Sequence, residues 1–304
     1  MSKPAPTSIK PLKPLRGVRI LSLALNLPGP AALMRLKAMG ATCLKAEPPG
    51  PKGAPAGTSG DPMGQYNPTA YAALHDRIKV ITIDLKSDKG QARLHKELAR
   101  TDLLLTSFRP SALAKLGLGW KALHKAYPQL CLVAIVGAPG ARAEEPGHDL
   151  TYLAENDLVT GLEMPPTLYA DMGGSLMTSE AVLQTRILSQ AKGKGVFLEI
   201  ALSDAAGYLA LPRSWGLTQT GAAVGGGHAG YRVYPCKDGR VAMAALEPHF
   251  SGRLGAAAGL RQSHPLAMMT PEAHATVAAF VAGQTREQLD LLAHTQDIPL
   301  FTLA

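Results

Sequence analysis

The sequence predicts an α/β protein whose large domain is Rossmann-like, with a parallel sheet, and whose second, smaller domain is α+β. The first observation is the order of elements at the start of the chain. An apolar run at 14–23 is followed by a Pro/Gly turn at 28–30, a helix-compatible stretch at 31–39 and a second apolar run at 40–47. This order is typical of a βαβ unit, whose two strands are parallel.

The second observation is that strands and helices continue to alternate. Strands are expected at 80–85, 103–106, 130–136 and 196–200, and helices from Ser87 to about Ala99 and from Ser179 to Gln190. Ser87 is the expected N-cap of its helix, because a serine hydroxyl can accept a backbone N–H at a helix start. The alternation predicts a parallel sheet with helices on both faces. Ligands bind beyond the carboxyl ends of such strands, and the run at 130–136 leads there, towards His148.

The third observation is a change of pattern in the last third of the chain. Apolar runs at 231–234 and 239–243 and a helical stretch from Pro271 to Ala282 predict the smaller α+β domain. Five glycines between 221 and 230 surround His228, and because they lack the GxGxxG and Walker spacings we expect a hinge there. Four segments follow: a mobile Lys/Pro-rich arm at 1–13, a large domain at 14–200, a linker at 201–228 and a small domain at 229–304.

Composition excludes several classes of protein. A chain of 304 residues with 46% hydrophobic residues can bury a sizeable core. No apolar run is long enough to span a bilayer and the start of the chain lacks a secretory signal, so we expect a cytoplasmic protein with no membrane partner. The three cysteines are widely spaced, which predicts reduced thiols and neither a disulfide framework nor a metal site.

The net charge of +8 leaves two interpretations open. Lysines and arginines are scattered along the chain, without a basic helix or interleaved aromatic residues, so we expect no nucleic-acid partner. The charge then reflects either a basic solvated surface or a site for an anionic ligand.

Two short stretches carry candidate acid/base chemistry. His148 and Asp149 follow Gly147, and Asp171 lies two residues before a glycine pair. Moving a proton from one face of a carbon to the other requires two groups of modest pKa and donors for the charge that develops. The alternative is structural: a loop histidine beside aspartates that serve as helix N-caps.

The order of several segments resembles the family III CoA-transferases and, within them, the alpha-methylacyl-CoA racemase branch. The segments are Leu15-Arg16-Gly17-Val18-Arg19, Pro28-Gly29-Pro30, Leu44-Lys45-Ala46-Glu47-Pro48-Pro49, Ile83-Asp84-Leu85-Lys86, Phe108-Arg109-Pro110, Leu116-Gly117-Leu118-Gly119, Pro128-Gln129-Leu130, Gly147-His148-Asp149, Asp171-Met172-Gly173-Gly174 and Leu246-Glu247-Pro248-His249-Phe250. Gly147-His148-Asp149 is similar to the racemase active-site turn, whose histidine the transferases usually lack.

The resemblance implies a function at the α-carbon of a 2-methylacyl-CoA thioester. His148 and Asp171 would exchange the α-proton on opposite faces, with Glu247 as an auxiliary near His148. Backbone N–H groups at a helix starting at Asp149 would stabilise the enolate. The resemblance further implies a homodimer and no cofactor beyond CoA as part of the substrate.

Phosphate groups of CoA need cationic partners. Arg77, Lys79 and Arg109 are the candidates, because a guanidinium binds phosphate through two hydrogen bonds and an ammonium acts as a point charge.

Two other functions stay open. In a CoA transferase, Asp149 would attack an acyl-CoA and form an anhydride and then a thioester. The third candidate is a catalytically degenerate paralogue that binds CoA esters, which is indicated by the end of the chain at Ala304, where family members continue into a tail that interlocks the dimer. Gly137-Ala138-Pro139-Gly140 also replaces the family's Gly-Phe-Gly or Gly-Tyr-Gly turn, and the segment between His148 and Asp171 is shorter than in typical racemases.

Overall fold

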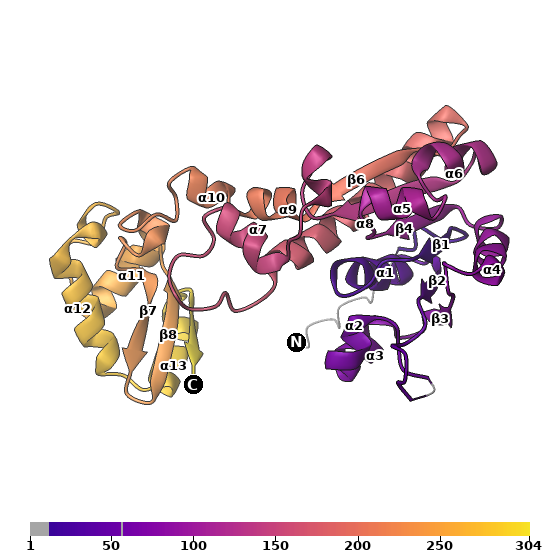
Figure 1. Ribbon diagram of the computed structural model, residues 1–304. Coiled ribbons are helices and arrows are strands. Elements are labelled where there is room, and N and C mark those ends of the chain that lie inside the picture. The colour runs from indigo at the N-terminus through magenta and orange to yellow at the C-terminus, as the bar shows by residue number, and fades with distance from the viewer. Residues whose placement is uncertain (1–11, 56) are drawn as a thin grey trace, which may run out of the picture. The chain divides into compact units, whose positions relative to one another are not determined.

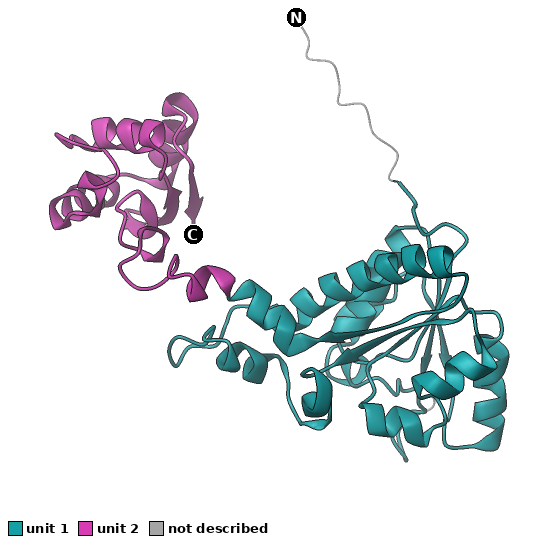
Figure 2. Ribbon diagram, turned by 90° about the horizontal axis from the view of Figure 1, so that it is seen from above, with its two compact units in different colours: residues 1–210 teal, residues 211–304 magenta. Residues whose placement is uncertain are grey.

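The computed structural model describes residues 12–55 and 57–304, which form two compact units (Figure 1). Unit 1 extends to Ala210 and unit 2 comprises Leu211–Ala304 (Figure 2). The division falls within the segment 201–228. The arm expected at 1–13 falls almost entirely outside the described residues.

Strands and helices alternate along unit 1. Its strands are β1 (Arg19–Ser22), β2 (Thr42–Glu47), β3 (Lys79–Thr82), β4 (Leu103–Thr106), β5 (Cys131–Val136) and β6 (Phe197–Ala201). Its helices are α1 (Pro28–Ala38), α2 (Pro62–Tyr66), α3 (Pro68–Leu74), α4 (Asp88–Leu98), α5 (Pro110–Lys115), α6 (Trp120–Ala126), the 3-10 helix η1 (Gly140–Glu144), α7 (Asp149–Glu155), α8 (Tyr169–Lys192) and α9 (Leu202–Leu209).

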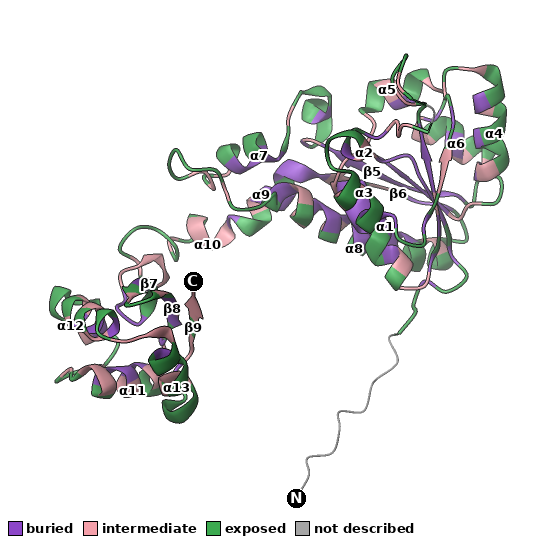
Figure 3. Ribbon diagram, turned by 90° about the horizontal axis from the view of Figure 1, so that it is seen from below, coloured by how far each residue is buried: buried purple, intermediate pink, exposed green. Residues whose placement is uncertain are grey.

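The strands of unit 1 form a parallel six-stranded sheet in the order β3-β2-β1-β4-β5-β6. This order is that of a Rossmann-like fold and confirms the predicted fold class. Successive side chains of a strand point to opposite faces of a sheet. Ile20 accordingly belongs to the core formed with α1 and α8, whereas Leu21 belongs to the core formed with α4, α5 and α6. The strands of this sheet are largely buried (Figure 3).

Unit 2 has its own core. Its elements are α10 (Leu211–Ser214), η2 (Ala223–Gly225), β7 (Tyr231–Cys236), β8 (Gly239–Ala244), α11 (Pro248–Ala258), η3 (Ala267–Met269), α12 (Pro271–Ala282), α13 (Arg286–Gln296) and β9 (Leu300–Leu303). The strands pair antiparallel in the order β7-β8-β9. Val241 of β8, Val277 of α12 and Leu289 of α13 are fully buried in one cluster, which confirms the smaller α+β domain.

Local capping follows the sequence at α4. The Ser87 hydroxyl accepts the Gly90 N–H at 3.1 Å, as predicted. The strand expected at 80–85 ends earlier, at Thr82. The N–H of the next residue, Ile83, still donates a hydrogen bond to Glu47 O.

The helix expected to begin at Ser179 begins at Tyr169 instead, so the Gly173-Gly174 pair lies inside α8. Packing explains the difference. A Cβ on Gly174 would overlap the Leu202 side chain, so the pair lets α9 approach α8 closely. The two glycines, which in the sequence are typical of a turn, here allow two helices to pack closely. Asp171 lies in the first turn of α8.

Among the described residues, no helix is both long and apolar enough to cross a membrane.

Candidate active site

A cavity of about 620 Å³ lies in unit 1 beyond the carboxyl ends of the strands. Backbone that follows β1, β4 and β5 lines it, together with the first turns of α7 and α8. The order of the strands reverses between β1 and β4, which is where open α/β sheets bind their ligands. His148, Asp149, Asp171 and Arg109 all line this cavity.

His148 is the residue immediately before α7 and its backbone is held in place. Its N–H donates to Thr151 Oγ1 at 3.1 Å, and that hydroxyl donates to His148 O at 2.7 Å. The residue is exposed and lines the cavity. The fixed backbone therefore presents the imidazole ring at the cavity.

Asp149 is buried, with 5% of its surface exposed. Its Oδ1 accepts the backbone N–H of Asp171 at 2.9 Å. The Asp149 carboxylate thus provides a hydrogen-bond acceptor for an N–H in the first turn of α8, where a negative charge is favourable. Neither aspartate is an N-cap, because His148 and Leu168 occupy those positions.

The side chain of Asp171 has no hydrogen-bond partner among the described residues and is half-buried. Its pKa is raised from 3.8 to about 6, chiefly by burial and then by the charge of Asp149, while His148 partly opposes the shift. A carboxyl group with a pKa near neutrality can both accept and return a proton, which suits acid/base catalysis.

One wall of the cavity is formed by residues after β1. Asn26 has a left-handed backbone, with φ of 62°, and its N–H donates to Asp61 Oδ1 at 3.0 Å. The same oxygen accepts the N–H of Met63 at 3.0 Å, so Asp61 joins the Asn26 turn to the start of α2. Both segments line the cavity, through Asn26 and Tyr66 among others.

Asp61 in turn belongs to a buried charged network. The ammonium of Lys45 is fully buried, pairs with Asp61 and lies 3.5 Å from Glu47 Oε2. Its third partner is His75 Nε2 at 3.0 Å, while His75 Nδ1 donates to Tyr71 O at 2.6 Å. Burial and then Lys45 lower the pKa of His75, which keeps the ring neutral and able to accept from the ammonium.

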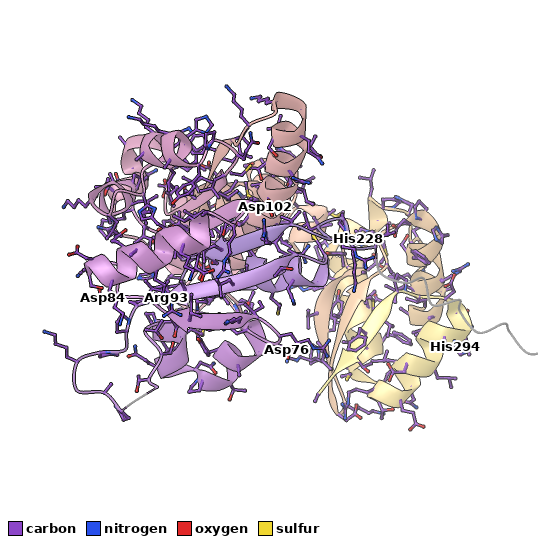
Figure 4. The ribbon with its side chains drawn as sticks, turned by 90° about the vertical axis from the view of Figure 1, so that its right-hand side faces the viewer. Asp76, Asp84, Arg93, Asp102, His228 and His294 are labelled. Atoms are coloured by element: carbon purple, nitrogen blue, oxygen red, sulfur yellow. The ribbon has the colours of Figure 1, made fainter. Side chains whose placement is uncertain are left out.

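The remaining predicted residues lie elsewhere. Lys79 begins β3 and Arg77 precedes it, at the amino end of the strand and away from the cavity. Figure 4 shows this polarity, because Asp76 and Asp102, which precede β3 and β4, lie at one end of the sheet and Asp84, which follows β3, lies at the other. Phosphate binding by Arg77 and Lys79 stays a prediction.

Glu247 is the residue before α11 and belongs to unit 2. Its proximity to His148 stays a prediction. Among the described residues, no group of three or more His, Cys, Asp and Glu side chains is placed to hold a metal ion.

The segments that build this site are those of a known family. The family model for CoA-transferase family III matches residues 15–303. The chain belongs to this family. Succinyl-CoA–D-citramalate CoA-transferase from Chloroflexus aurantiacus is 32% identical over 224 residues, which cover 68% of this chain and 53% of that protein. This family III chain therefore spans about half the length of that relative.

Racemases of the family are also similar to the chain. Human alpha-methylacyl-CoA racemase is 27% identical over 265 residues, covering 81% of this chain and 65% of that protein. Among solved structures, the hypothetical protein Rv3272 from Mycobacterium tuberculosis matches with a TM-score of 0.80 at 23% identity, covering 96% of this chain and 84% of that one. A CAIB/BAIF family protein from Brucella suis matches with a TM-score of 0.75 at 20% identity, covering 95% and 84%. These structures share the fold of the family III chain.

Two features of this family III site are absent from the residues predicted from the sequence: the Lys45–Asp61 pair, which supports one wall of the cavity, and Tyr152, which lines it. A lysine within the apolar strand β2 was the available signal, because an unpaired charge is rarely buried. Tyr152 follows His148 by four residues, the spacing that places two side chains on one side of a helix.

Proposed function

We propose that the cavity of unit 1 exchanges the α-proton of a 2-methylacyl-CoA thioester by two-base chemistry, which racemises or epimerises that carbon. The observation that carries this proposal is that His148 and Asp171 line one cavity and lie close enough for the charge of His148 to act on the pKa of Asp171. One group removes the proton from one face and the other returns a proton to the opposite face.

The enolate formed between these steps needs hydrogen-bond donors. The backbone N–H groups of Asp149 and Leu150, in the first turn of α7, have no acceptor among the described residues, and both residues line the cavity. They are our candidates to bind the thioester oxygen as negative charge develops on it. Asp149 contributes through its backbone here, while its carboxylate positions α8.

The remainder of CoA has two candidate contacts in unit 1. Arg109 lines the main cavity and would bind a phosphate through paired hydrogen bonds. A smaller cavity of about 140 Å³ shares Leu25 with the main one and is lined mostly by apolar residues, together with Glu47, Asp84 and Lys86. Its apolar walls suit the faces of the adenine ring.

The comparisons support the racemase assignment through coverage. The mouse alpha-methylacyl-CoA racemase aligns over 296 residues, or 90% of this chain, at 27% identity. The presence of His148 supports the same choice, because a second base is required only for exchange on two faces.

CoA transfer between carboxylic acids is the second candidate, and the higher identity of the transferase relatives, at 32% and 30%, favours it. In this reaction a carboxylate attacks the thioester carbonyl, releases CoA thiolate and forms an anhydride. The thiolate then attacks the aspartyl carbonyl, which releases the donor acid and leaves an aspartyl-CoA thioester. The acceptor carboxylate attacks this thioester, releases CoA thiolate and forms a second anhydride, and the thiolate attacks the acceptor's carbonyl in that anhydride, which gives the new acyl-CoA and frees the aspartate. Asp149 was the expected nucleophile, but its Oδ1 already accepts an N–H, so Asp171 is the more available carboxylate.

The deciding experiment follows the α-proton signal of a 2-methylacyl-CoA in deuterium oxide by NMR. Wild type, His148→Gln and Asp171→Asn are compared, with exposed His294→Gln as the matched control. Exchange that occurs in wild type and the control but is lost in both site variants supports the racemase. No exchange in wild type, with CoA transfer from succinyl-CoA to an added acid, would establish the transferase instead. Binding of the thioester without either reaction would assign a binding protein.

A further inference from the structure

Tyr152 lies one helical turn after His148 in α7 and lines the same cavity. The residue is 7% exposed. A buried tyrosine normally finds a hydrogen-bond partner for its hydroxyl. The Tyr152 hydroxyl has no such partner among the described residues. It is not one of the fully buried side-chain atoms that lack a partner, so a ligand can reach it. Tyr152 also lines a smaller cavity beside Arg142, but its hydroxyl lies next to Gly137 and Gly147, which line the main cavity. A ligand in the main cavity is therefore the candidate partner of this hydroxyl.

Two glycines determine where the hydroxyl lies. A Cβ on Gly137, directly after β5, would overlap the Tyr152 oxygen. A Cβ on Gly147 would lie 2.5 Å from that oxygen and 2.6 Å from the ring carbon Cε1. Only glycine permits such a close approach of the backbone to the phenol. Because Gly147 directly precedes His148, the phenol and the imidazole are held by the same short segment.

The charges around the phenol keep it protonated. Burial raises the pKa of Tyr152, and the negative charge of Asp171 raises it further, while Arg109 opposes the shift. At neutral pH the group is therefore a hydrogen-bond donor. It also lies close enough to Asp171 for that charge to act on it.

We propose that Tyr152 is a further catalytic residue, whose hydroxyl donates a hydrogen bond to the thioester oxygen of the substrate. This inference rests on the proposed function. When one base takes the α-proton, the electron pair of the C–H bond moves into the carbonyl group and negative charge develops on its oxygen. Tyr152 stabilises that charge and keeps its own proton, and reprotonation at carbon reverses the shift. The hydroxyl thereby supplements the backbone donors of α7.

The test is Tyr152→Phe, which removes one oxygen atom and keeps the ring. We expect kcat for α-proton exchange to fall by about 100-fold, with KM within about threefold of wild type, because the interaction strengthens in the transition state. The melting temperature should not fall, because no described protein group uses this hydroxyl. Tyr127→Phe is the matched control, since its hydroxyl lies at the surface beside His95.

A binding measurement separates this inference from the proposed function. Isothermal titration compares a 2-methylacyl-CoA with the thioether analogue that lacks the carbonyl oxygen. Tyr152→Phe should weaken binding of the thioester by no more than about threefold, in line with the small change in KM, and leave binding of the thioether unchanged. Unchanged kcat in Tyr152→Phe beside an active wild type would overturn the role of Tyr152 alone. A parallel loss of kcat and melting temperature would overturn it in favour of a structural role. A wild type that binds neither compound would overturn the proposed function as well.

Discussion

The carboxylate of Asp149 accepts the backbone N–H of Asp171 at 2.9 Å, across 22 residues of sequence. This bond joins the first turn of α7, which follows His148, to the first turn of α8, which carries Asp171. The two candidate bases are consequently placed by one contact. The Asp149 side chain thus has a positioning role, because it holds the start of α8 against α7.

Asp149→Ala removes the acceptor from the start of α8. We expect the free energy of unfolding to fall by about 1–2 kcal/mol, the usual cost of an N-terminal acceptor in a helix. Asp149→Asn keeps an acceptor oxygen and should recover most of that loss. Urea denaturation at pH 7 measures the effect. The exposed Asp204, in the first turn of α9, provides the control Asp204→Ala, and an equal loss there would contradict the assignment.

Asp171→Asn should stabilise the protein above pH 6. The pKa of Asp171 is about 6 in the folded protein, against 3.8 for an aspartate without interactions. Between pH 3.8 and pH 6 the folded state therefore retains a proton that the unfolded state releases. The stability that this proton confers is present below pH 4 and is lost as the pH rises through 6. We expect the variant to exceed wild type by on the order of 2 kcal/mol at pH 7.5.

The measurement for Asp171→Asn is urea denaturation at several pH values between 4 and 8. The difference from wild type should shrink towards zero near pH 4, where both side chains are neutral. A constant difference at every pH would contradict the raised pKa.

Lys45→Met should be strongly destabilising. The ammonium is fully buried between Asp61 and Glu47, and its removal leaves their carboxylates without their cation. Breaking one side of a buried pair costs about 3–5 kcal/mol. Arg142→Met is the control, because the pair of Arg142 with Glu155 is exposed and solvent screens it, so its loss should change the unfolding free energy little. Similar losses of unfolding free energy in the two variants would refute the special role of Lys45.

Unit 2 should lose stability in mild acid because of His228, which is 2% exposed. Its Nδ1 accepts the Gly230 N–H at 3.0 Å, so the neutral ring carries its proton on Nε2. Burial and then His274 lower its pKa. The unfolded chain therefore takes up a proton first as the pH falls below about 6.5, and stability is lost there.

The check is the unfolding of wild type and His228→Asn at pH 7.5 and pH 5. An asparagine side chain retains an acceptor for Gly230 but does not titrate. The loss of stability between the two pH values should therefore be smaller in the variant. An equal loss in both proteins would show that other groups cause it.

Several parts of the fold were predictable because they depend on neighbouring residues. The βαβ opening follows from short-range hydrophobic patterns, and β4 lies at Leu103–Thr106 as expected. The hydroxyl of Ser87 caps α4 through a bond to a residue three positions away. Prediction failed at the start of α8, because Gly173 and Gly174 are read locally as a turn while their role is to admit α9.

The sequence by itself determined the alternation of strands and helices, and through it the fold class, together with the residue types available for acid/base chemistry. Those features arise from hydrogen bonds and side-chain periodicity within a few residues. Only the tertiary structure decided that Asp149 binds the backbone of Asp171, that Asp61 pairs with Lys45, and that Gly137 determines the position of the Tyr152 hydroxyl. Burial and charge at these places depend on groups distant in sequence, and they determine which carboxylate has a pKa near neutrality.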